Sequence, residues 1–184
     1  EWNGTAWVLK GSQINGLTTN EEFGWSVSIN SDGTIVAIGA YSFDGGVGTN
    51  SGTTRIYEWN GTAWVLKGSQ INGLTSNEYS GVSVSINGDG TIVAIGAYYF
   101  SGGAGNNSGT TRIYEWNGTA WNLKGSQIDG LTGGEVSGIS ISINSDGTII
   151  AIGASSHNST RGTTRIYEWS GTAWVLKGLS LIHI

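Results

Sequence analysis

The chain consists almost entirely of one repeated segment. Equivalent segments begin at Glu1, Glu58, Glu115 and Glu168, so the spacings between them are 57, 57 and 53 residues. The first two copies differ at only nine of 57 positions, and the third copy is four residues shorter in one loop. This period is too long for a β-helix, and it indicates stacked supersecondary units that each contact their neighbours.

Each repeat contains four strand candidates. In the first repeat these are residues 24–30, 34–40, 53–59 and 63–71. The first candidate alternates apolar residues with Ser, as expected for a strand with two different faces. The second is apolar on both faces, which is typical of a strand in the middle of a stacked sheet. Four antiparallel strands in every repeat predict the blade of a β-propeller.

The last two strand candidates of each repeat are expected to form a hairpin. Asn60 and Gly61 separate them, and both residue types tolerate the positive φ of a two-residue type I′ turn. Such a turn pairs Trp59 with Thr62, and Tyr57 with Trp64. The two tryptophans recur in every copy of the hairpin, so we expect them to pack between blades rather than to bind a ligand.

The predicted fold class is therefore all-β, with three four-stranded antiparallel propeller blades and an orphan N-terminal strand. The blades are expected at about 24–71, 81–128 and 138–178, in a single partial propeller over 1–178. Residues 1–14 would be the outer strand of a preceding blade. Propellers usually close with four to eight blades, so three blades predict a fragment of a larger propeller. The last residues, 179–184, depart from the repeat and are expected to be a non-native tail.

Composition excludes two classes of partner. The net charge is −5 and there are only eight Lys and Arg residues, so no nucleic-acid binding is expected, because it requires clustered basic residues. No apolar run approaches the roughly 18 residues of a membrane span, so no membrane span is expected. The absence of Cys excludes disulfides and thiolate metal sites.

The start of each repeat resembles a known family. The run Phe23-Gly24-Trp25-Ser26-Val27-Ser28, followed by an Asp-Gly turn and the segment Ile35-Val36-Ala37-Ile38-Gly39-Ala40, is similar to the FG-GAP repeat. That repeat forms the seven-bladed propeller of integrin α chains and occurs in secreted bacterial and algal proteins. The resemblance implies a propeller and an extracellular or cell-surface location. The Phe-Gly pair itself is present only in the first copy, because Ser80-Gly81 and Ser137-Gly138 replace it.

The resemblance also implies possible calcium sites. Many members of the family bind this ion in the turn between the first two strands, where the corresponding candidates here are Asn30, Asp32, Asp89 and Asp146. Calcium takes about six oxygen ligands, several of them carboxylates. Each turn supplies only one carboxylate, so we expect structural turns, with no metal and no cofactor.

No set of residues suggests catalysis, and we expect that the chain is not an enzyme. With no Cys and two His residues, a catalytic triad would have to use His157, which lies in a variable loop and is expected to be solvated. Glu21, Glu78 and Glu135 precede the first strand of each repeat and are expected to be solvated or capping residues.

The better candidates for ligand binding lie in the loop between the second and third strands, because loops on a rigid scaffold commonly carry recognition. These candidates are Tyr41, Phe43, Asp44, Tyr98, Tyr99 and Phe100. The most economical function is a non-catalytic binding or adhesion module, with a protein or glycan ligand and with further blades or self-association. Two alternatives remain, since fold does not decide function: a purely structural spacer repeat, and the scaffold of an enzyme whose chemistry lies outside this chain.

Overall fold

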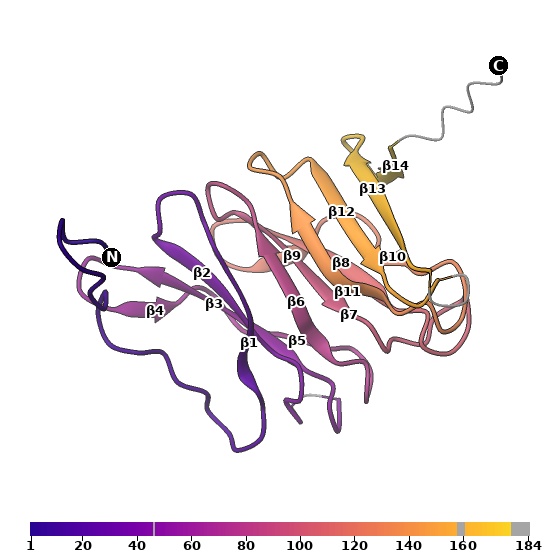
Figure 1. The fold of residues 1–184 in the computed structure, drawn as a ribbon, viewed down its shortest axis with the longest axis horizontal. Coiled ribbons are helices and arrows are strands. Elements are labelled where there is room, and N and C mark those ends of the chain that lie inside the picture. Colours follow the sequence, from indigo (N-terminus) through magenta and orange to yellow (C-terminus); the bar gives the residue numbers. More distant parts are fainter. Residues whose placement is uncertain (46, 158–160, 178–184) are drawn as a thin grey trace.

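The structure is a computed structural model that describes residues 1–45, 47–157 and 161–177. Every element with described bounds is a β-strand, and the strands form three antiparallel sheets that follow one another in chain order (Figure 1). The prediction of an all-β chain with four-stranded antiparallel units is confirmed. No helix among the described residues is long and apolar enough to cross a membrane. The predicted tail, 179–184, lies outside the described residues.

We call the three sheets blades one, two and three. The strands of blade one are β1 (Phe23–Ile29), β2 (Ile35–Ala40), β3 (Thr53–Trp59), β4 (Trp64–Leu66) and β5 (Ile71–Asn72). Those of blade two are β6 (Ser80–Ile86), β7 (Ile92–Ala97), β8 (Thr110–Trp116), β9 (Trp121–Leu123) and β10 (Ile128–Asp129). Those of blade three are β11 (Ser137–Ile143), β12 (Ile149–Ala154), β13 (Thr163–Trp169) and β14 (Trp174–Leu176).

Each blade has the same strand order. In blade one the order is β1-β2-β3-β4, and β5 pairs with the first residues of β3, where Thr54 faces Ile71. The two-residue strand β5 arises because the chain leaves the hairpin after Leu66 and returns to β3 only at Ile71. The predicted single strand over 63–71 is therefore two short strands that share one neighbour.

The predicted register of the hairpin is wrong by two residues. Trp59 pairs with Trp64 and Tyr57 with Leu66, so the connecting turn has four residues instead of two. The Asn60 side chain explains the longer turn, because its Oδ1 accepts hydrogen bonds from the Thr62 and Ala63 N–H groups. A shift of two residues leaves every side chain on its predicted face.

The hydrophobic core lies between the blades. At the first junction, Ile35, Ala37 and Ile56 of blade one pack against one face of blade two. That face consists of Val84, Ile86, Val93 and Ile95. The second junction repeats the arrangement with Ile92, Ala94, Ile113 and Ile128 against Ile143, Ile150 and Ile152. The middle strand of blade two is buried along its whole length, as its apolar sequence predicts.

Polar contacts repeat at the two junctions as well. The Ser26 hydroxyl donates to the Gly81 carbonyl at 2.7 Å, and Ser83 donates to Gly138 at the same distance. The blades approach so closely here that a Cβ on Gly39 would lie 2.0 Å from the Gly81 oxygen. Glycine is therefore required at this position of the second strand.

A third contact joins each hairpin to the preceding blade. The Trp121 indole N–H donates to the Lys67 carbonyl at 2.8 Å, and the Lys67 ammonium lies 5.1 Å from the Trp116 ring centroid. Lys10 contacts blade one in this way, and Lys124 contacts blade three. The prediction that the recurring tryptophans pack between blades is confirmed.

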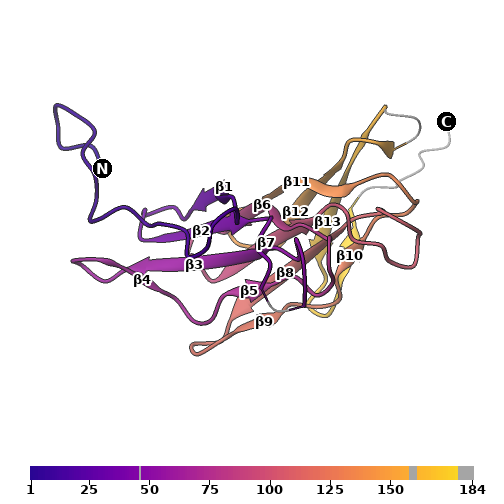
Figure 2. The same ribbon diagram turned by 90° about the horizontal axis from the view of Figure 1, so that it is seen from below.

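The N-terminal segment extends away from the stacked sheets (Figure 2). Within residues 1–14, the described pairing is a single bridge between Trp2 and Trp7. The segment is anchored where Lys10 meets Trp59 and Trp64, and again where Glu21 meets Arg55.

Candidate functional site

The repeats differ from one another mainly at one end of the blades. Of the nine differences between the first two copies, eight lie in the connector before the first strand, at the start of that strand, or in the loop between the second and third strands. These segments are adjacent because the start of β1 pairs with the end of β2, where Phe23 faces Ala40. The scaffold is therefore nearly constant, while one end of it varies.

Five aromatic side chains meet at this variable end, and we call them the aromatic cluster. The cluster consists of Trp25, Tyr41, Tyr79, Tyr98 and Tyr99. Trp25 packs edge-on against Tyr41 with ring centroids 4.8 Å apart, and Tyr41 lies 5.8 Å from Tyr79. Tyr79 then contacts both Tyr98 and Tyr99, at 5.6 and 5.4 Å. The contacts form a continuous row of rings from blade one to blade two.

The cluster is partly open to solvent. Tyr99 is 38% exposed and Trp25 is 59% exposed, whereas Tyr41, Tyr79 and Tyr98 are half-buried. Burial raises the pKa of Tyr98, and the neighbouring tyrosines raise it further. The Tyr98 hydroxyl is therefore neutral at physiological pH. The cluster offers uncharged ring faces and hydroxyl groups, which suits a ligand with both apolar surface and hydrogen-bonding groups.

The structure separates the predicted loop candidates into two groups. Tyr41, Tyr98 and Tyr99 join the aromatic cluster. Phe43 and Phe100 instead lie over the guanidinium groups of Arg55 and Arg112, at 5.2 and 5.1 Å. Asp44 accepts a hydrogen bond from the Asn50 N–H within its own loop, at 2.8 Å.

Two members of the cluster, Trp25 and Tyr79, were not predicted from the sequence. Trp25 is in the first strand and Tyr79 is in the connector, so neither lies in the loop that was expected to carry recognition. A signal was nevertheless present, because the equivalent residues in the other copies are not aromatic. Val82 and Ile139 stand in the place of Trp25, and Glu22 and Val136 stand in the place of Tyr79.

The prediction that the glutamates recurring before the first strand of each repeat are solvated is wrong. Glu21, Glu78 and Glu135 are buried, and each forms a bidentate ion pair with an arginine of its own blade. The capping role is confirmed, since Glu78 also accepts a hydrogen bond from the Leu74 N–H. Burial alone would raise the pKa of Glu21, but the hydrogen bonds from Arg55 and the Leu17 N–H lower it below its ordinary value.

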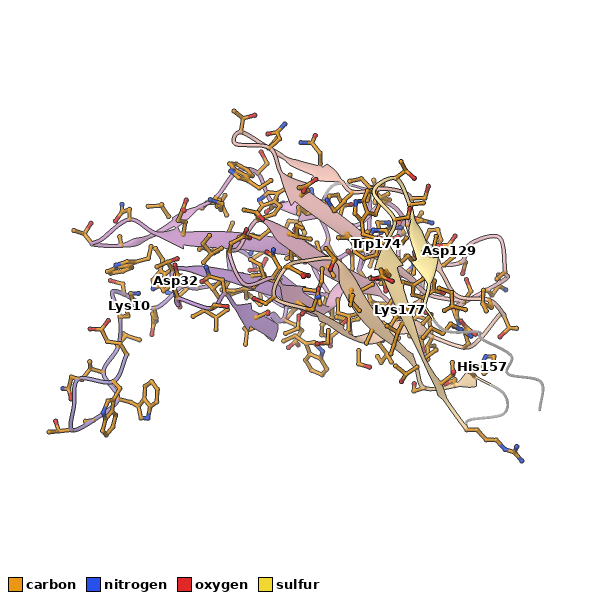
Figure 3. The ribbon with its side chains drawn as sticks, turned by 90° about the horizontal axis from the view of Figure 1, so that it is seen from above. Lys10, Asp32, Asp129, His157, Trp174 and Lys177 are labelled. Carbon is orange, nitrogen blue, oxygen red and sulfur yellow. The ribbon has the colours of Figure 1, made fainter. Side chains whose placement is uncertain are left out.

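His157 is likewise not a solvated loop residue. It occupies the place that Phe43 and Phe100 have in the other blades, at the blade-three end of the molecule (Figure 3). Its Nδ1 lies 2.9 Å from the Glu135 carboxylate, and it is half-buried. The histidine thus belongs to the ion pair between Glu135 and Arg165, and no serine nucleophile contacts it among the described residues.

The calcium candidates lie in the turns between the first two strands. Asp32 accepts hydrogen bonds from the Thr34 N–H and hydroxyl groups, and the hydrogen bond from the hydroxyl is the main reason that the Asp32 pKa is lowered. Asn30 accepts from the Thr34 and Ile35 N–H groups. Asp89 and Asp146 repeat the contacts of Asp32, and all three line an open hollow of about 740 Å³. The described residues contain no group of three His, Cys, Asp or Glu placed to hold a metal ion. This geometry gives the three aspartates a role in stabilising the turns.

Known proteins match the chain at the level of the repeat and of the fold. Residues 16–57 match the FG-GAP repeat family. No curated protein sequence matches the chain. Two solved structures with propeller-type folds are similar to it: the hydrazine synthase of Kuenenia stuttgartiensis, with a TM-score of 0.55 and 8% identity, and Sqt1 of Saccharomyces cerevisiae, with a TM-score of 0.54 and 12% identity. Each covers 92% of this chain, which spans 38% and 37% of their respective lengths. The chain therefore contains an FG-GAP repeat at residues 16–57 and is built from β-propeller blades.

Proposed function

We propose that the chain is a non-catalytic binding module of an extracellular or cell-surface repeat protein, and that the aromatic cluster is its ligand platform. The observation that carries this proposal is the place of the cluster. It lies at the end of the blades where the repeats differ, and its residues include Tyr99, which replaces Ser42 of the first copy. The resemblance of the repeats to those of secreted and surface proteins supports the proposed location.

A neutral glycan fits this platform best. Sugar rings present apolar C–H faces that pack on aromatic rings, and their hydroxyl groups can bond to tyrosine hydroxyls. The net charge of −5 disfavours an anionic ligand. A cleft of about 370 Å³ is lined by Ser42, Asp44 and Asn50 among others. The Asn50 side-chain amide donates to the Tyr79 hydroxyl at 3.4 Å, so the cleft adds polar groups next to the rings.

A glycan array followed by titration with the best neutral oligosaccharide tests the proposal. Binding is followed through intrinsic fluorescence, since Trp25 belongs to the cluster. Tyr98→Ala combined with Tyr99→Ala should weaken binding by about tenfold, as expected when aromatic anchors are removed. The control is Leu123→Ala, because Leu123 is exposed on the hairpin of blade two. Equal affinity in the double variant and the parent would reject the cluster as the platform, and capture of a peptide instead of a glycan would change the ligand class.

A structural spacer is the second candidate, favoured by the repetition of every junction contact. It predicts that no ligand distinguishes the double variant from the parent. An enzymatic scaffold remains the third candidate, and hydrolase activity in a longer form of the protein would support it.

A further inference from the structure

Four of the seven tyrosines lie in one group at the junction of blades one and two. The other three, Tyr57, Tyr114 and Tyr167, stand at the same position of the third strand in each blade, and none contacts another tyrosine ring among the described residues. The sequence contains neither Cys nor Met, whose sulfur atoms oxidants commonly attack. The group therefore concentrates the side chains of this sequence that are most readily oxidised. Its members are Tyr41, Tyr79, Tyr98 and Tyr99.

Tyr79 and Tyr99 are the two members of the group that have no aromatic counterpart in the other blades. Glu22 and Val136 stand at the position of Tyr79, and a serine stands at the position of Tyr99 in both other copies. Both tyrosines thus occur together in blade two. Their rings are also in contact, with centroids 5.4 Å apart and planes inclined at 56°.

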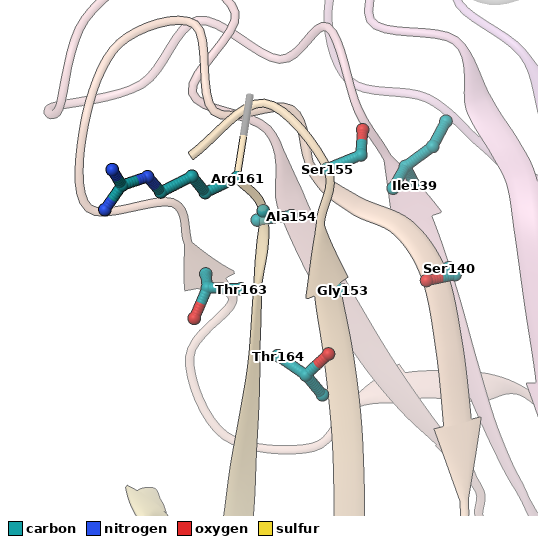
Figure 4. A pocket seen from close by; sticks show the side chains of 9 residues that line it. Ile139, Ser140, Gly153, Ala154, Ser155, Arg161, Thr163 and Thr164 are labelled. Atoms are coloured by element: carbon teal, nitrogen blue, oxygen red, sulfur yellow. The ribbon is translucent and has the colours of Figure 1, made fainter. Parts of the chain in front are cut away.

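The backbone holds these two positions together in blade three as well as in blade two. The Tyr99 N–H donates to the Glu78 carbonyl at 3.3 Å, and the Ser156 N–H donates to the Glu135 carbonyl at 3.2 Å. Each bond joins the loop after the second strand to the connector that enters the same blade. Figure 4 shows this end of blade three, where Ser155 lines a pocket of about 390 Å³ whose lining contains no aromatic side chain among the described residues. The pair of tyrosines is therefore a feature that blade two adds to a shared backbone geometry.

An oxidant can reach this pair from solvent. Tyr99 is 38% exposed, and blades one and three both pack on blade two, so this exposure is measured with the neighbouring blades in place. Tyr79 is half-buried in contact with the Tyr99 ring. A radical formed on Tyr99 can take an electron from Tyr79 through this contact, and Tyr99 can then be oxidised a second time.

We propose that Tyr79 and Tyr99 form an oxidative cross-linking site, which hydrogen peroxide and a haem peroxidase convert into a dityrosine bond. Each phenol loses one electron and one proton, and the two phenoxyl radicals join through the ring carbons next to their oxygens. The hydrogen atoms on those two carbons then move to the oxygens, which restores both phenols. The two electrons and two protons reduce the peroxide to two molecules of water. The bond joins the connector of blade two covalently to the loop between β7 and β8.

The other tyrosine pairs of the group are poorer candidates. Tyr98 and Tyr99 are closer, at 4.4 Å, but they are adjacent in the chain, so a bond between them would join the loop only to itself. Tyr41 lies 5.8 Å from Tyr79 and is less exposed than Tyr99. The pair of Tyr79 and Tyr99 joins two separate segments at the shortest ring distance and includes the most exposed tyrosine of the group.

Peptide mapping of the full chain after treatment with hydrogen peroxide and a haem peroxidase tests the proposal. Digestion with trypsin and with a proteinase that cleaves before Asp places Tyr79 in residues 68–88 and Tyr99 in residues 89–112. The expected product is these two peptides joined, two hydrogen atoms lighter than the separate peptides. A link within 89–112, a link to residues 32–43, a link between two chains, or oxidised tryptophan without any link would overturn the proposal.

Phenylalanine variants identify the two partners, because they keep the ring and remove the phenol. Tyr79→Phe and Tyr99→Phe should each abolish the blue fluorescence of dityrosine. Tyr98→Phe and Tyr57→Phe are the matched controls and should retain it, and circular dichroism checks that every variant is folded. Fluorescence that persists in Tyr79→Phe, or that is lost in Tyr98→Phe, would overturn the assignment.

A second site built in blade three tests whether the backbone geometry specifies the cross-link. Val136 has a φ of 52° and Tyr79 one of 57°, so Val136→Tyr requires no new backbone conformation. Combined with Ser156→Tyr, it should give an additional link between residues 129–145 and 146–161. Absence of that link in the folded double variant would overturn the geometric argument.

The cross-link should also stabilise the chain, because it constrains the unfolded state as a disulfide does. The Tm of the cross-linked chain should exceed that of the untreated chain by about 5 °C, whereas the same treatment of Tyr99→Phe should not raise it. An unchanged Tm in the cross-linked chain would overturn this structural role. The inference does not rest on glycan binding, since every measurement is made without a glycan and the affinity of the untreated chain tests the ligand platform separately.

Discussion

Both terminal guanidinium nitrogens of Arg112 donate hydrogen bonds to the carboxylate of Glu78, at 2.7 and 3.1 Å, and both side chains are buried. The arginine lies on β8, and the glutamate lies 34 residues earlier, in the connector that enters the blade. The ion pair therefore fixes the path of the connector relative to the third strand. Its counterparts in the other blades have the same geometry.

Removing one partner of this pair should be strongly destabilising. Arg112→Met leaves the Glu78 carboxylate buried without its counter-charge, so the free energy of unfolding should fall by about 3–5 kcal/mol. Lys177→Met breaks a pair with Glu168 in which both side chains are about half exposed, and should cost less than about 1 kcal/mol. Urea denaturation of both variants measures the difference. Equal losses would contradict the special role of the buried pair.

Blade three should lose stability in acid. Burial alone would raise the pKa of Glu135, but hydrogen bonds from Arg165, the Leu131 N–H and His157 outweigh it and lower the pKa from 4.5 to about 2. Because the folded value lies below the ordinary one, this stabilisation is present above about pH 4.5 and is lost as the pH falls through 2. The contribution amounts to about 3 kcal/mol. Denaturation at a series of pH values should give a flatter profile for Glu135→Gln, whereas the surface variant Glu168→Gln should keep the slope of the parent.

The contact between each hairpin and the preceding blade should depend on the indole N–H. Trp121→Phe keeps an aromatic side chain but removes the donor to the Lys67 carbonyl and part of the packed ring, so the free energy of unfolding should fall by at least about 1 kcal/mol. Trp7→Phe is the control, since the Trp7 ring is exposed and should cost less than about 0.5 kcal/mol. A loss of the same size at Trp7 would show that the effect is not due to the contact between blades.

The aspartate turns should stabilise the fold without calcium. Asp89→Ala removes the acceptor for the Thr91 N–H and hydroxyl groups and should cost about 1 kcal/mol in chelator. Adding calcium to about 2 mM should change the Tm of the parent by less than about 1 °C. A rise of several degrees that Asp89→Ala abolishes would instead identify these turns as calcium sites.

The sheets could be predicted because the sequence repeats. Each copy must satisfy the same contacts, so the apolar second strand and the alternating first strand indicate the same sheet three times. The hairpin register could not be predicted in this way. The alternation of side chains is identical for a turn of two or four residues, and only the hydrogen bonds accepted by the Asn60 side chain distinguish them.

The buried ion pairs and the aromatic cluster depend on tertiary contacts, which a local reading of the sequence does not contain. Glu21 pairs with Arg55, which lies 34 residues further along the chain, and no residue near Glu21 in the sequence indicates that its side chain is buried. The row of rings likewise joins the first strand of blade one, two loops and the connector of blade two. The positions where the copies differ provide the one sequence signal for it, because they mark Trp25, Tyr79 and Tyr99 together.

The hydrogen bond from a serine of one blade to a glycine carbonyl of the next has a consequence for how such a gene can change. The same contact occurs at both junctions, between Ser26 and Gly81 and between Ser83 and Gly138, and each time it links adjacent repeats of the chain. A recombination event that inserts or deletes one complete repeat would form the same serine–glycine contact from residues already present. The length of the array is thus free to vary by whole units, whereas a shorter change leaves the contact intact when it falls in a loop, as the loss of four residues in the third copy does.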